Sequence, residues 1–300
     1  MSRSTEAAAT ARKKTGTKTK TFGTGKRESH DASAFYDRKL VQVDVSKDTT
    51  CNPSPVVDEI LCANSEEMSD LVDNSVALMV TSPPYHVGKE YDADYPFEDY
   101  LAMLRRVFTE THRVLEPGGR AVINVANLGR RPYVPLTSHI NMMMLDLGFL
   151  MRGEIVWRKA KADSGSCAWG TWRKADNPVL RDVHEYLLVF SKGRFGRARK
   201  GDSTLAADEF RIATTSVWDD ISPASAKRVG HPAPFPIALP ERLIRLYSYV
   251  GDLILDPFMG AGSTAIAALR NDRHYVGYEI SQEYVALATE RIEAEREEPD

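Results

Sequence analysis

Cysteine is scarce in this sequence, and long apolar runs are missing from it. The three cysteines, Cys51, Cys62 and Cys167, form no Cys-X-X-Cys pair, so the sequence offers neither a disulfide framework nor the ligand spacing of a zinc site. No apolar run approaches the ~20 residues that cross a bilayer, and the N-terminus lacks the apolar stretch of a secretion signal. We therefore expect a cytoplasmic protein with no membrane partner and no bound metal.

Charge is unevenly distributed along the chain. The net charge of −3 combines a basic N-terminus, where residues 1–30 hold eight Lys and Arg against two Glu, with a net acidic remainder. The basic segment has too few apolar residues to fold alone. We predict a basic, disordered tail over 1–35 and a folded domain over 36–300. The tail is either a solvated segment or an arm that touches phosphates without reading sequence.

Within the folded domain, short β-branched runs alternate with amphipathic segments, which is typical of a parallel sheet covered by helices. Two segments, 160–182 and 192–230, break this alternation and are candidate functional insertions, because long stretches without regular elements tend to carry function. The expected strands lie near 57–62, 77–82, 120–125, 153–158, 185–191, 252–256 and 274–279. The expected helices lie near 65–73, 97–115, 135–147, 240–250, 262–271 and 281–296.

The second candidate insertion begins with a basic loop. "KGRFGRARKG" (192–201) contains five Lys and Arg, one aromatic residue and no acid. Such a loop suits a phosphate backbone, although it could also simply face solvent. The candidate nucleic-acid contacts, here and elsewhere in the chain, are Lys89, Arg173, Lys192, Arg194, Arg197, Arg199 and Lys200.

A glycine turn near the C-terminus is the most informative stretch. "LILD" reads as a buried strand, "PFMGAGS" as a tight turn and "STAIAALR" as the start of a helix, and the next strand leads to Glu279, nineteen residues beyond Gly260. That spacing places an acid where it can accept bonds from ribose hydroxyls. No phosphate-cradling Gly-Lys-Ser/Thr follows and Gly-X-Gly-X-X-Gly is incomplete, so we expect an adenosine without a polyphosphate, with a carboxylate at the helix start. A purely structural turn is the alternative.

Four motifs in one order carry a family resemblance. "TSPPY" (81–85) and "DPFMGAGST" (256–264) resemble the catalytic and cofactor motifs of DNA amino-methyltransferases, in the permuted order of their β group. "HEYLLVFSKG" (184–193) and "HPAPFPIALPERLI" (231–244) are similar to further segments of that group. The resemblance implies a permuted, Rossmann-like sheet with helices on both faces and a small inserted DNA-recognition region. It also implies S-adenosyl-L-methionine (AdoMet) as cofactor and double-stranded DNA as substrate.

The resemblance assigns roles to individual residues. Asn64 stands where relatives usually have an acid that contacts the adenine, and Phe235 and Pro236 belong to the segment that covers AdoMet. A homodimer and a cognate restriction endonuclease acting on the same site are the implied protein partners. The candidate cofactor residues are Asn64, Phe235, Pro236, Asp256, Phe258, Gly260, Gly262, Ser263, Thr264 and Glu279.

The "TSPPY" motif predicts how a weak nucleophile is prepared. An exocyclic base amine is a poor nucleophile because its lone pair is delocalised into the ring. Ser82 Oγ and the Pro83 carbonyl can accept its hydrogens, and Pro83-Pro84 fixes their geometry in advance. Tyr85 can stack on the extruded base, since the amine is out of reach inside a duplex.

Ser82 also predicts the target base. In the family, Ser at this position is typical of cytosine-N4 enzymes and Asp of adenine-N6 enzymes, so we expect cytosine N4, with adenine N6 as the alternative. None of the cysteines follows a proline, which argues against methylation at carbon 5 through a cysteine nucleophile. An RNA or protein-glutamine methyltransferase and an inactive DNA-binding regulator are the more distant alternatives.

Overall fold

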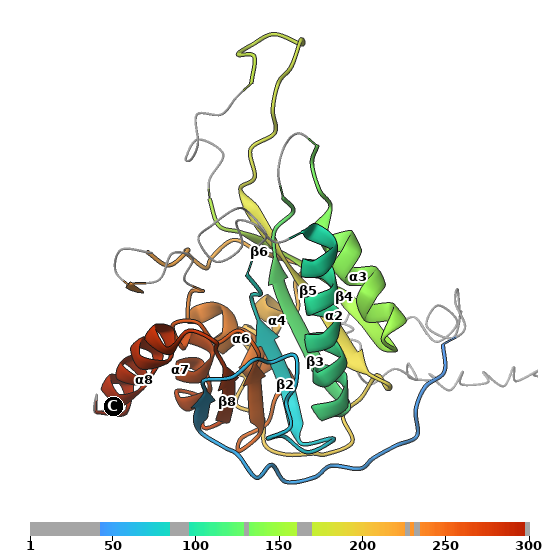
Figure 1. The fold of residues 1–300 in the computed structure, drawn as a ribbon, viewed down its shortest axis with the longest axis vertical. Helices are drawn as coiled ribbons and strands as arrows, with labels where there is room; N and C mark the ends of the chain where they lie inside the picture. The colour runs from blue at the N-terminus through green and yellow to red at the C-terminus, as the bar shows by residue number, and fades with distance from the viewer. Residues whose placement is uncertain are drawn as a thin grey trace, which may run out of the picture. The chain divides into compact units, whose positions relative to one another are not determined.

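The computed structural model describes residues 43–84, 96–128, 132–160, 170–225, 229–230 and 235–297. The chain divides into two units, Met1–Asp44 and Val45–Asp300, and the fold described here is that of the second unit (Figure 1). The predicted tail over 1–35 lies outside the described residues. No helix among the described residues is long and apolar enough to cross a membrane.

The centre of the second unit is an eight-stranded sheet with the order β1-β8-β7-β2-β3-β5-β4-β6. Every neighbouring pair is parallel except the two that β5 forms with β3 and β4. The strands are β1 (Glu59–Leu61), β2 (Val76–Thr81), β3 (Leu115–Val125), β4 (Phe149–Arg158), β5 (His184–Lys192), β6 (Val217–Trp218), β7 (Leu253–Asp256) and β8 (His274–Tyr278).

Helices cover both faces of this sheet (Figure 1). One core cluster packs α2 and α3 on the sheet, and a second packs α6, α7 and α8 on the opposite face. The central strand β2 serves both, because alternate side chains of a strand point to opposite faces: Met79 belongs to the first cluster, and Leu78 and Val80 belong to the second. The helices are α2 (Phe97–Val114), α3 (Leu136–Asp146), α4 (Ala207–Ala213), α6 (Ala238–Tyr247), α7 (Ser263–Leu269) and α8 (Gln282–Glu297).

Hydrophobic periodicity predicted most of these elements, with three exceptions. The seven expected strands and five of the expected helices are present, but residues 65–73 form turns instead of a helix. Arg113 of α2 donates to the carbonyl oxygens of Met68 and Leu71 at 2.8 and 2.9 Å. The Arg113 side chain therefore supplies hydrogen bonds to carbonyl oxygens that helical backbone N–H groups would otherwise bond. The short α4 and β6 were not predicted.

The permuted order creates a point where the chain leaves the sheet in two directions. From β7 the chain continues through α7 to β8 on one side, and from β2 it continues through α2 to β3 on the other. β7 and β2 are direct neighbours, with Leu78 paired to Ile254. Ligands of open α/β sheets bind outside the carboxyl ends of the strands at such a point, and here those ends carry Ser82 and Asp256.

Candidate active site

A buried carboxylate joins the carboxyl ends of β7 and β2. Asp256, the last residue of β7, is 3% exposed. Its Oδ1 accepts a hydrogen bond from Thr81 Oγ1 at 2.7 Å, and its Oδ2 accepts one from Thr264 Oγ1 at 2.6 Å. The Phe258 N–H donates to Oδ1 at 3.1 Å. Asp256 therefore ties the glycine turn and α7 to the strand that leads into Ser82.

The same burial makes Asp256 an unusual acid. Burial raises the pKa of Asp256 to about 6, against the opposing effect of the hydrogen bonds from Thr264, Thr81 and the Phe258 amide. The negative charge of Glu279 also raises this pKa. Because both carboxylate oxygens have donors within the protein, we infer that Asp256 serves the cofactor site by holding the turn in place.

The Glu279 carboxylate closes the glycine turn from the neighbouring strand. It follows β8 directly, and its Oε2 accepts the Gly260 N–H at 2.9 Å while Oε1 accepts the Ser281 N–H at 2.9 Å. A carboxylate oxygen can accept two hydrogen bonds, so each oxygen retains capacity for a ligand hydroxyl. The structure thus brings Glu279 to the turn, as the spacing predicts. Its contact with a ribose stays a prediction.

Two glycines give the turn its shape. Gly260 has φ +51° and Gly262 has φ +78°, a region that residues with a Cβ rarely adopt. Gly262 is also the N-cap of α7, and a Cβ at this position would approach Ala288 of α8 to 3.0 Å. Both the backbone conformation and the packing of α8 therefore require a small residue in the turn.

The charges at the turn suit a cationic adenosine better than a polyphosphate. The structure places the carboxylates of Asp256 and Glu279 there, and the guanidinium of Arg291 bonds the Ala261 carbonyl oxygen. Carboxylates repel phosphate groups and attract a positive charge. AdoMet, which carries a sulfonium and two ribose hydroxyls but no phosphate, fits this set of donors and acceptors.

The remaining predicted cofactor residues lie around the same edge. Phe235 packs against the second core cluster and Phe258 against the first. Pro236 is buried, as are Ser263 and Thr264 at the start of α7.

Asn64 lies just beyond β1 and is exposed. Its amide is used within its own turn, because Oδ1 accepts the Glu66 N–H at 3.0 Å and Nδ2 donates to Glu66 Oε1 at 2.9 Å. An adenine contact by this side chain therefore stays a prediction.

Ser82 stands at the carboxyl end of β2 beside a buried proline. Pro83 is buried, and Ser82 and Pro84 are half-buried. Asn124 Nδ2, near the end of β3, lies 3.4 Å from Ser82 Oγ and 2.7 Å from Glu185 Oε2. Neither Asn124 nor Glu185 was predicted from the sequence, although Asn124 interrupts the apolar run of 121–125 and Glu185 directly precedes the apolar run of 186–190. Tyr85 and Lys89, predicted for base stacking and DNA contact, lie outside the described residues.

The basic loop of 192–201 makes several contacts within the protein. Lys192 Nζ donates to Asn74 Oδ1 at 2.6 Å and to the carbonyl oxygens of Arg113 and Leu115 at 2.9 and 2.8 Å. It therefore caps the C-terminal end of α2. The same environment, through burial first, lowers the pKa of Lys192 to about 8. A contact of Lys192 with DNA stays a prediction.

Two further arginines of this loop form ion pairs within the protein, although Arg197 is buried and Arg199 is exposed. Arg197 is 9% exposed and pairs with Asp252 and, at 2.6 Å, with Glu116, while Arg199 pairs with the other oxygen of Glu116. Asp252 precedes β7 and Glu116 lies at the start of β3. These pairs therefore lie at the amino-terminal edge, opposite Ser82, and the DNA contact of Arg197 and Arg199 stays a prediction.

The last two basic residues of the loop are Arg194, which is half-buried, and Lys200. Arg194 donates to the Asp48 carbonyl oxygen at 2.9 Å, and Lys200 is exposed. Both lie in the segment that follows β5 at the amino-terminal edge.

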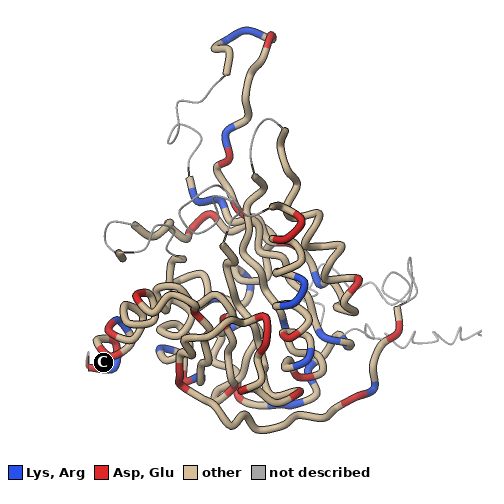
Figure 2. The backbone as a smooth tube through the Cα atoms, in the orientation of Figure 1, with Lys and Arg blue, Asp and Glu red and all other residues tan. Residues whose placement is uncertain are grey.

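The connection between β4 and β5 leaves the sheet on the side where the parallel strands have their carboxyl ends, which is also the side of Ser82 and Asp256. Arg158 at the end of β4 pairs with His184 at the start of β5, and Val125 at the end of β3 pairs with Tyr186. Residues 170–183 of this connection extend beyond the sheet (Figure 1). We call these residues the arm. Lysine and arginine occur along it in Figure 2, and Trp172 within it is 62% exposed.

Comparisons with known proteins agree with this arrangement. A family model described as DNA methylase matches residues 76–290. The type II methyltransferase M.MthZI of Methanothermobacter thermautotrophicus is 29% identical over 76% of this chain and 74% of its own length.

Solved structures show the same fold. TTHA0409 of Thermus thermophilus, described as a DNA modification methylase and solved with AdoMet, is 34% identical over 80% of this chain and 94% of its own, with a TM-score of 0.65. The PvuII DNA methyltransferase, described as cytosine-N4-specific, shares the fold at 21% identity over 83% of this chain and 90% of its own, with a TM-score of 0.63.

Proposed function

Because the chain belongs to the DNA methylase family that matches residues 76–290, we propose that it transfers a methyl group from AdoMet to the N4 amine of cytosine. The substrate is double-stranded DNA that contains a specific sequence. The enzyme is a DNA methyltransferase of the N6/N4 type and its cofactor is AdoMet. The position of Ser82 supports the proposal that the methyl group is transferred to an amine.

The observation that carries this proposal is the hydrogen bond that joins the "TSPPY" motif to the "DPFMGAGST" motif. Thr81 precedes Ser82 and bonds Asp256 at 2.7 Å, and Asp256 precedes the glycine turn. An amine held at Ser82 would therefore lie beside the cofactor turn. AdoMet supplies a methyl group activated by its sulfonium. Ser82 Oγ and the Pro83 carbonyl accept hydrogen bonds from the amine, which favours a tetrahedral nitrogen with an available lone pair. The nitrogen would take the methyl group directly from the sulfonium, S-adenosylhomocysteine would leave, and the nitrogen would lose one proton to solvent.

The choice between cytosine and adenine rests on Ser82. A hydroxyl is a neutral acceptor that can also donate, whereas Asp would be a charged acceptor only. The resemblance associates Ser with cytosine N4, so we propose cytosine and keep adenine N6 as the alternative. Base-resolved methylation sequencing of DNA from cells that express the protein identifies both the base and its sequence context. N6-methyladenine in a fixed context would overturn the choice of cytosine, and unmodified DNA would overturn the proposed function.

We propose that the arm of residues 170–183, which overlaps the predicted insertion of 160–182, contacts the DNA around the target base. It projects from the edge that holds Ser82 (Figure 1), and it carries Arg173, Lys174 and Arg181. Its tip is built by short-range bonds, since the Thr171 N–H donates to the Asn177 carbonyl oxygen at 2.9 Å. A Cβ at Gly170 would approach that oxygen to 2.2 Å. A shaped, basic arm suits contact with a phosphate backbone and groove.

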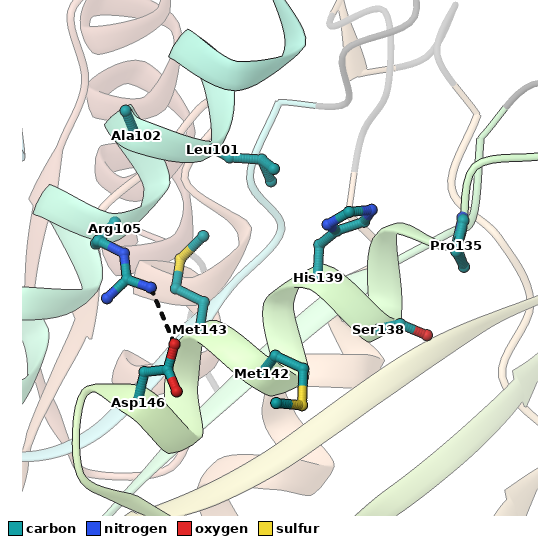
Figure 3. Close-up of a pocket in the computed structure, with 9 residues that line it drawn as sticks. All are labelled: Leu101, Ala102, Arg105, Pro135, Ser138, His139, Met142, Met143 and Asp146. Carbon is teal, nitrogen blue, oxygen red and sulfur yellow. Dashed lines mark hydrogen bonds and ion pairs between the residues drawn. The ribbon is translucent and has the colours of Figure 1, made fainter.

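We also propose a homodimer formed through the groove between α2 and α3. The groove has a volume of about 580 Å³ and is lined by Leu101 of α2 and Met143 of α3, among others (Figure 3). Met142, which also lines the groove, is 60% exposed, so one surface offers both a hollow and an apolar side chain. The Arg105–Asp146 pair, at 3.3 Å, lies at the same groove. A two-fold contact can exchange this pair between subunits.

Sedimentation measures this dimer directly. We expect the wild type to sediment as a dimer and Met142→Lys as a monomer. The matched control is Val250→Lys, which alters an apolar residue that is 45% exposed and not part of the groove. A wild-type monomer, or a dimer unchanged by Met142→Lys, would contradict the proposed interface.

The proposed protein partner in the cell is a restriction endonuclease that cuts the same sequence. Methylation at that sequence would protect it. We expect DNA from expressing cells to resist one endonuclease specificity that cleaves the DNA of control cells.

A further inference from the structure

A polar network is buried behind Ser82, where apolar packing would be expected. Residues 187–190 of β5 are at most 2% exposed and apolar, yet Glu185 in the same strand is 6% exposed. Asn124, 2% exposed, interrupts the apolar end of β3 in the same way. Burial of a carboxylate costs free energy that its ion pair seldom recovers. A network in this position therefore calls for a role other than stability.

The contacts run in one line toward the proposed amine site. Lys159, which follows β4, donates to Glu185 Oε1. Glu185 Oε2 accepts a hydrogen bond from Asn124 Nδ2 at 2.7 Å, and the same nitrogen lies 3.4 Å from Ser82 Oγ. One residue that follows β4, one of β5 and one of β3 thus form a path that ends at Ser82.

The carboxylate determines which way the Asn124 amide points. A carboxylate only accepts hydrogen bonds, whereas an amide side chain can donate through nitrogen or accept through oxygen. Glu185 therefore selects the nitrogen of Asn124, and the second hydrogen of that nitrogen is directed at Ser82 Oγ. A hydroxyl oxygen that receives this bond is restricted in its rotation, and it keeps a second lone pair for another donor.

We infer that Glu185 is a positioning residue for the methyl transfer: acting through Asn124, it holds Ser82 Oγ in the orientation that accepts the target amine. This inference rests on the proposed function, because it gives Ser82 the task of binding that amine. Glu185 itself touches neither the amine nor the cofactor. Lys159 holds the far oxygen of Glu185, so the carboxylate keeps its place while Asn124 bonds the near oxygen.

A double-mutant cycle tests whether Glu185 acts through Ser82. Glu185→Gln can turn the Asn124 amide, since a Gln side chain offers a donor as well as an acceptor. We expect the single-turnover rate of DNA methylation to fall about 10- to 100-fold, as for a small misplacement of a catalytic group. Affinities for AdoMet and DNA should be unchanged. In a Ser82→Ala background, Glu185→Gln should cause no further loss of rate, because the hydroxyl that Glu185 is proposed to orient is absent.

The matched control is Glu154→Gln. Glu154 on β4 also accepts a hydrogen bond from an asparagine, Asn141 Nδ2 at 2.8 Å, but this pair is exposed. We expect this variant to keep the wild-type rate. If Glu185→Gln does not fold, Lys159→Met replaces it in the cycle, because Lys159 is partly exposed and its loss frees the same carboxylate.

The outcomes separate the inference from the function on which it rests. A wild-type rate in Glu185→Gln would overturn the inference, and so would an equal loss of rate with and without Ser82. A loss of thermal stability with an unchanged rate would make the network purely structural. A wild-type protein that methylates no DNA would overturn the proposed function instead.

Discussion

Replacing Asp256 by asparagine should change how the stability of the protein depends on pH. The folded protein raises the pKa of Asp256 from 3.8 to about 6 through burial. The folded state therefore binds this proton more tightly than the unfolded state does. The stability that the group contributes is fully present below pH 3.8 and is lost as the pH rises through about 6. At ~1.36 kcal/mol per pH unit, the loss is about 3 kcal/mol.

The asparagine of the variant cannot ionise, so the variant avoids this loss. Its Oδ1 can still accept from Thr81, and its Nδ2 can donate to Thr264 Oγ1. Urea unfolding measures the free energy of unfolding of both proteins between about pH 3 and pH 7. We expect the value for Asp256→Asn minus the value for wild type to rise by about 3 kcal/mol across this range.

Thr264 provides the matched controls. Thr264→Ser keeps the hydroxyl that bonds Oδ2 and should retain the wild-type pH dependence. Thr264→Val removes this donor and should move the loss of stability to higher pH. A difference between Asp256→Asn and wild type that is constant, or that shrinks as the pH rises, would refute the reasoning. It would mean that the bonds from Thr81 and Thr264 outweigh the cost of burial.

Three further predictions concern the cofactor turn and the arm. AdoMet should raise the Tm of the wild type by mass action. It should not raise the Tm of a folded Gly260→Val variant, because the positive φ at position 260 disfavours a β-branched residue. An unchanged AdoMet affinity in this variant would place the turn outside the cofactor site. Glu279→Ala should weaken AdoMet binding by about 1–3 kcal/mol, the cost of lost charged hydrogen bonds, and normal affinity with lost turnover would contradict the ribose contact. Neutralising Arg173, Lys174 and Arg181 together should flatten the salt dependence of DNA binding by about 0.9 log unit per lost phosphate contact. Arg194→Gln, at the opposite edge, should leave that slope unchanged, and an unaltered slope in the arm variant would show that the arm does not contact DNA.

The sequence alone predicts the parts of the site that depend on neighbouring residues. The "TSPPY" stretch ends a strand, and the glycine turn joins a strand to a helix, because proline and glycine dictate local backbone geometry. The meeting of Glu279 with Gly260 follows from the length of one strand–helix–strand unit. These features need no knowledge of how distant strands pair.

The sequence does not predict contacts between distant segments. Arg197 looks like a free basic residue because its partners, Glu116 and Asp252, lie 81 and 55 residues away along the chain. Glu185 and Asn124 are 61 residues apart and meet only because β5 turns back antiparallel to β3. Local composition therefore shows that residues 192–201 are basic but does not show which side chains these basic groups contact. It also does not predict the buried polar network of Lys159, Glu185 and Asn124.

The central claim is that Ser82 holds the target amine beside the cofactor turn. Single-turnover methylation by Ser82→Ala, with saturating AdoMet and duplex DNA, tests this claim most directly. Loss of one acceptor at the reacting group should lower the rate about 10²- to 10³-fold, while AdoMet and DNA bind as in the wild type. A fluorescent analogue at the target position should still report extrusion of the base. A Ser82→Ala variant that methylates cytosine at the wild-type rate would contradict the account.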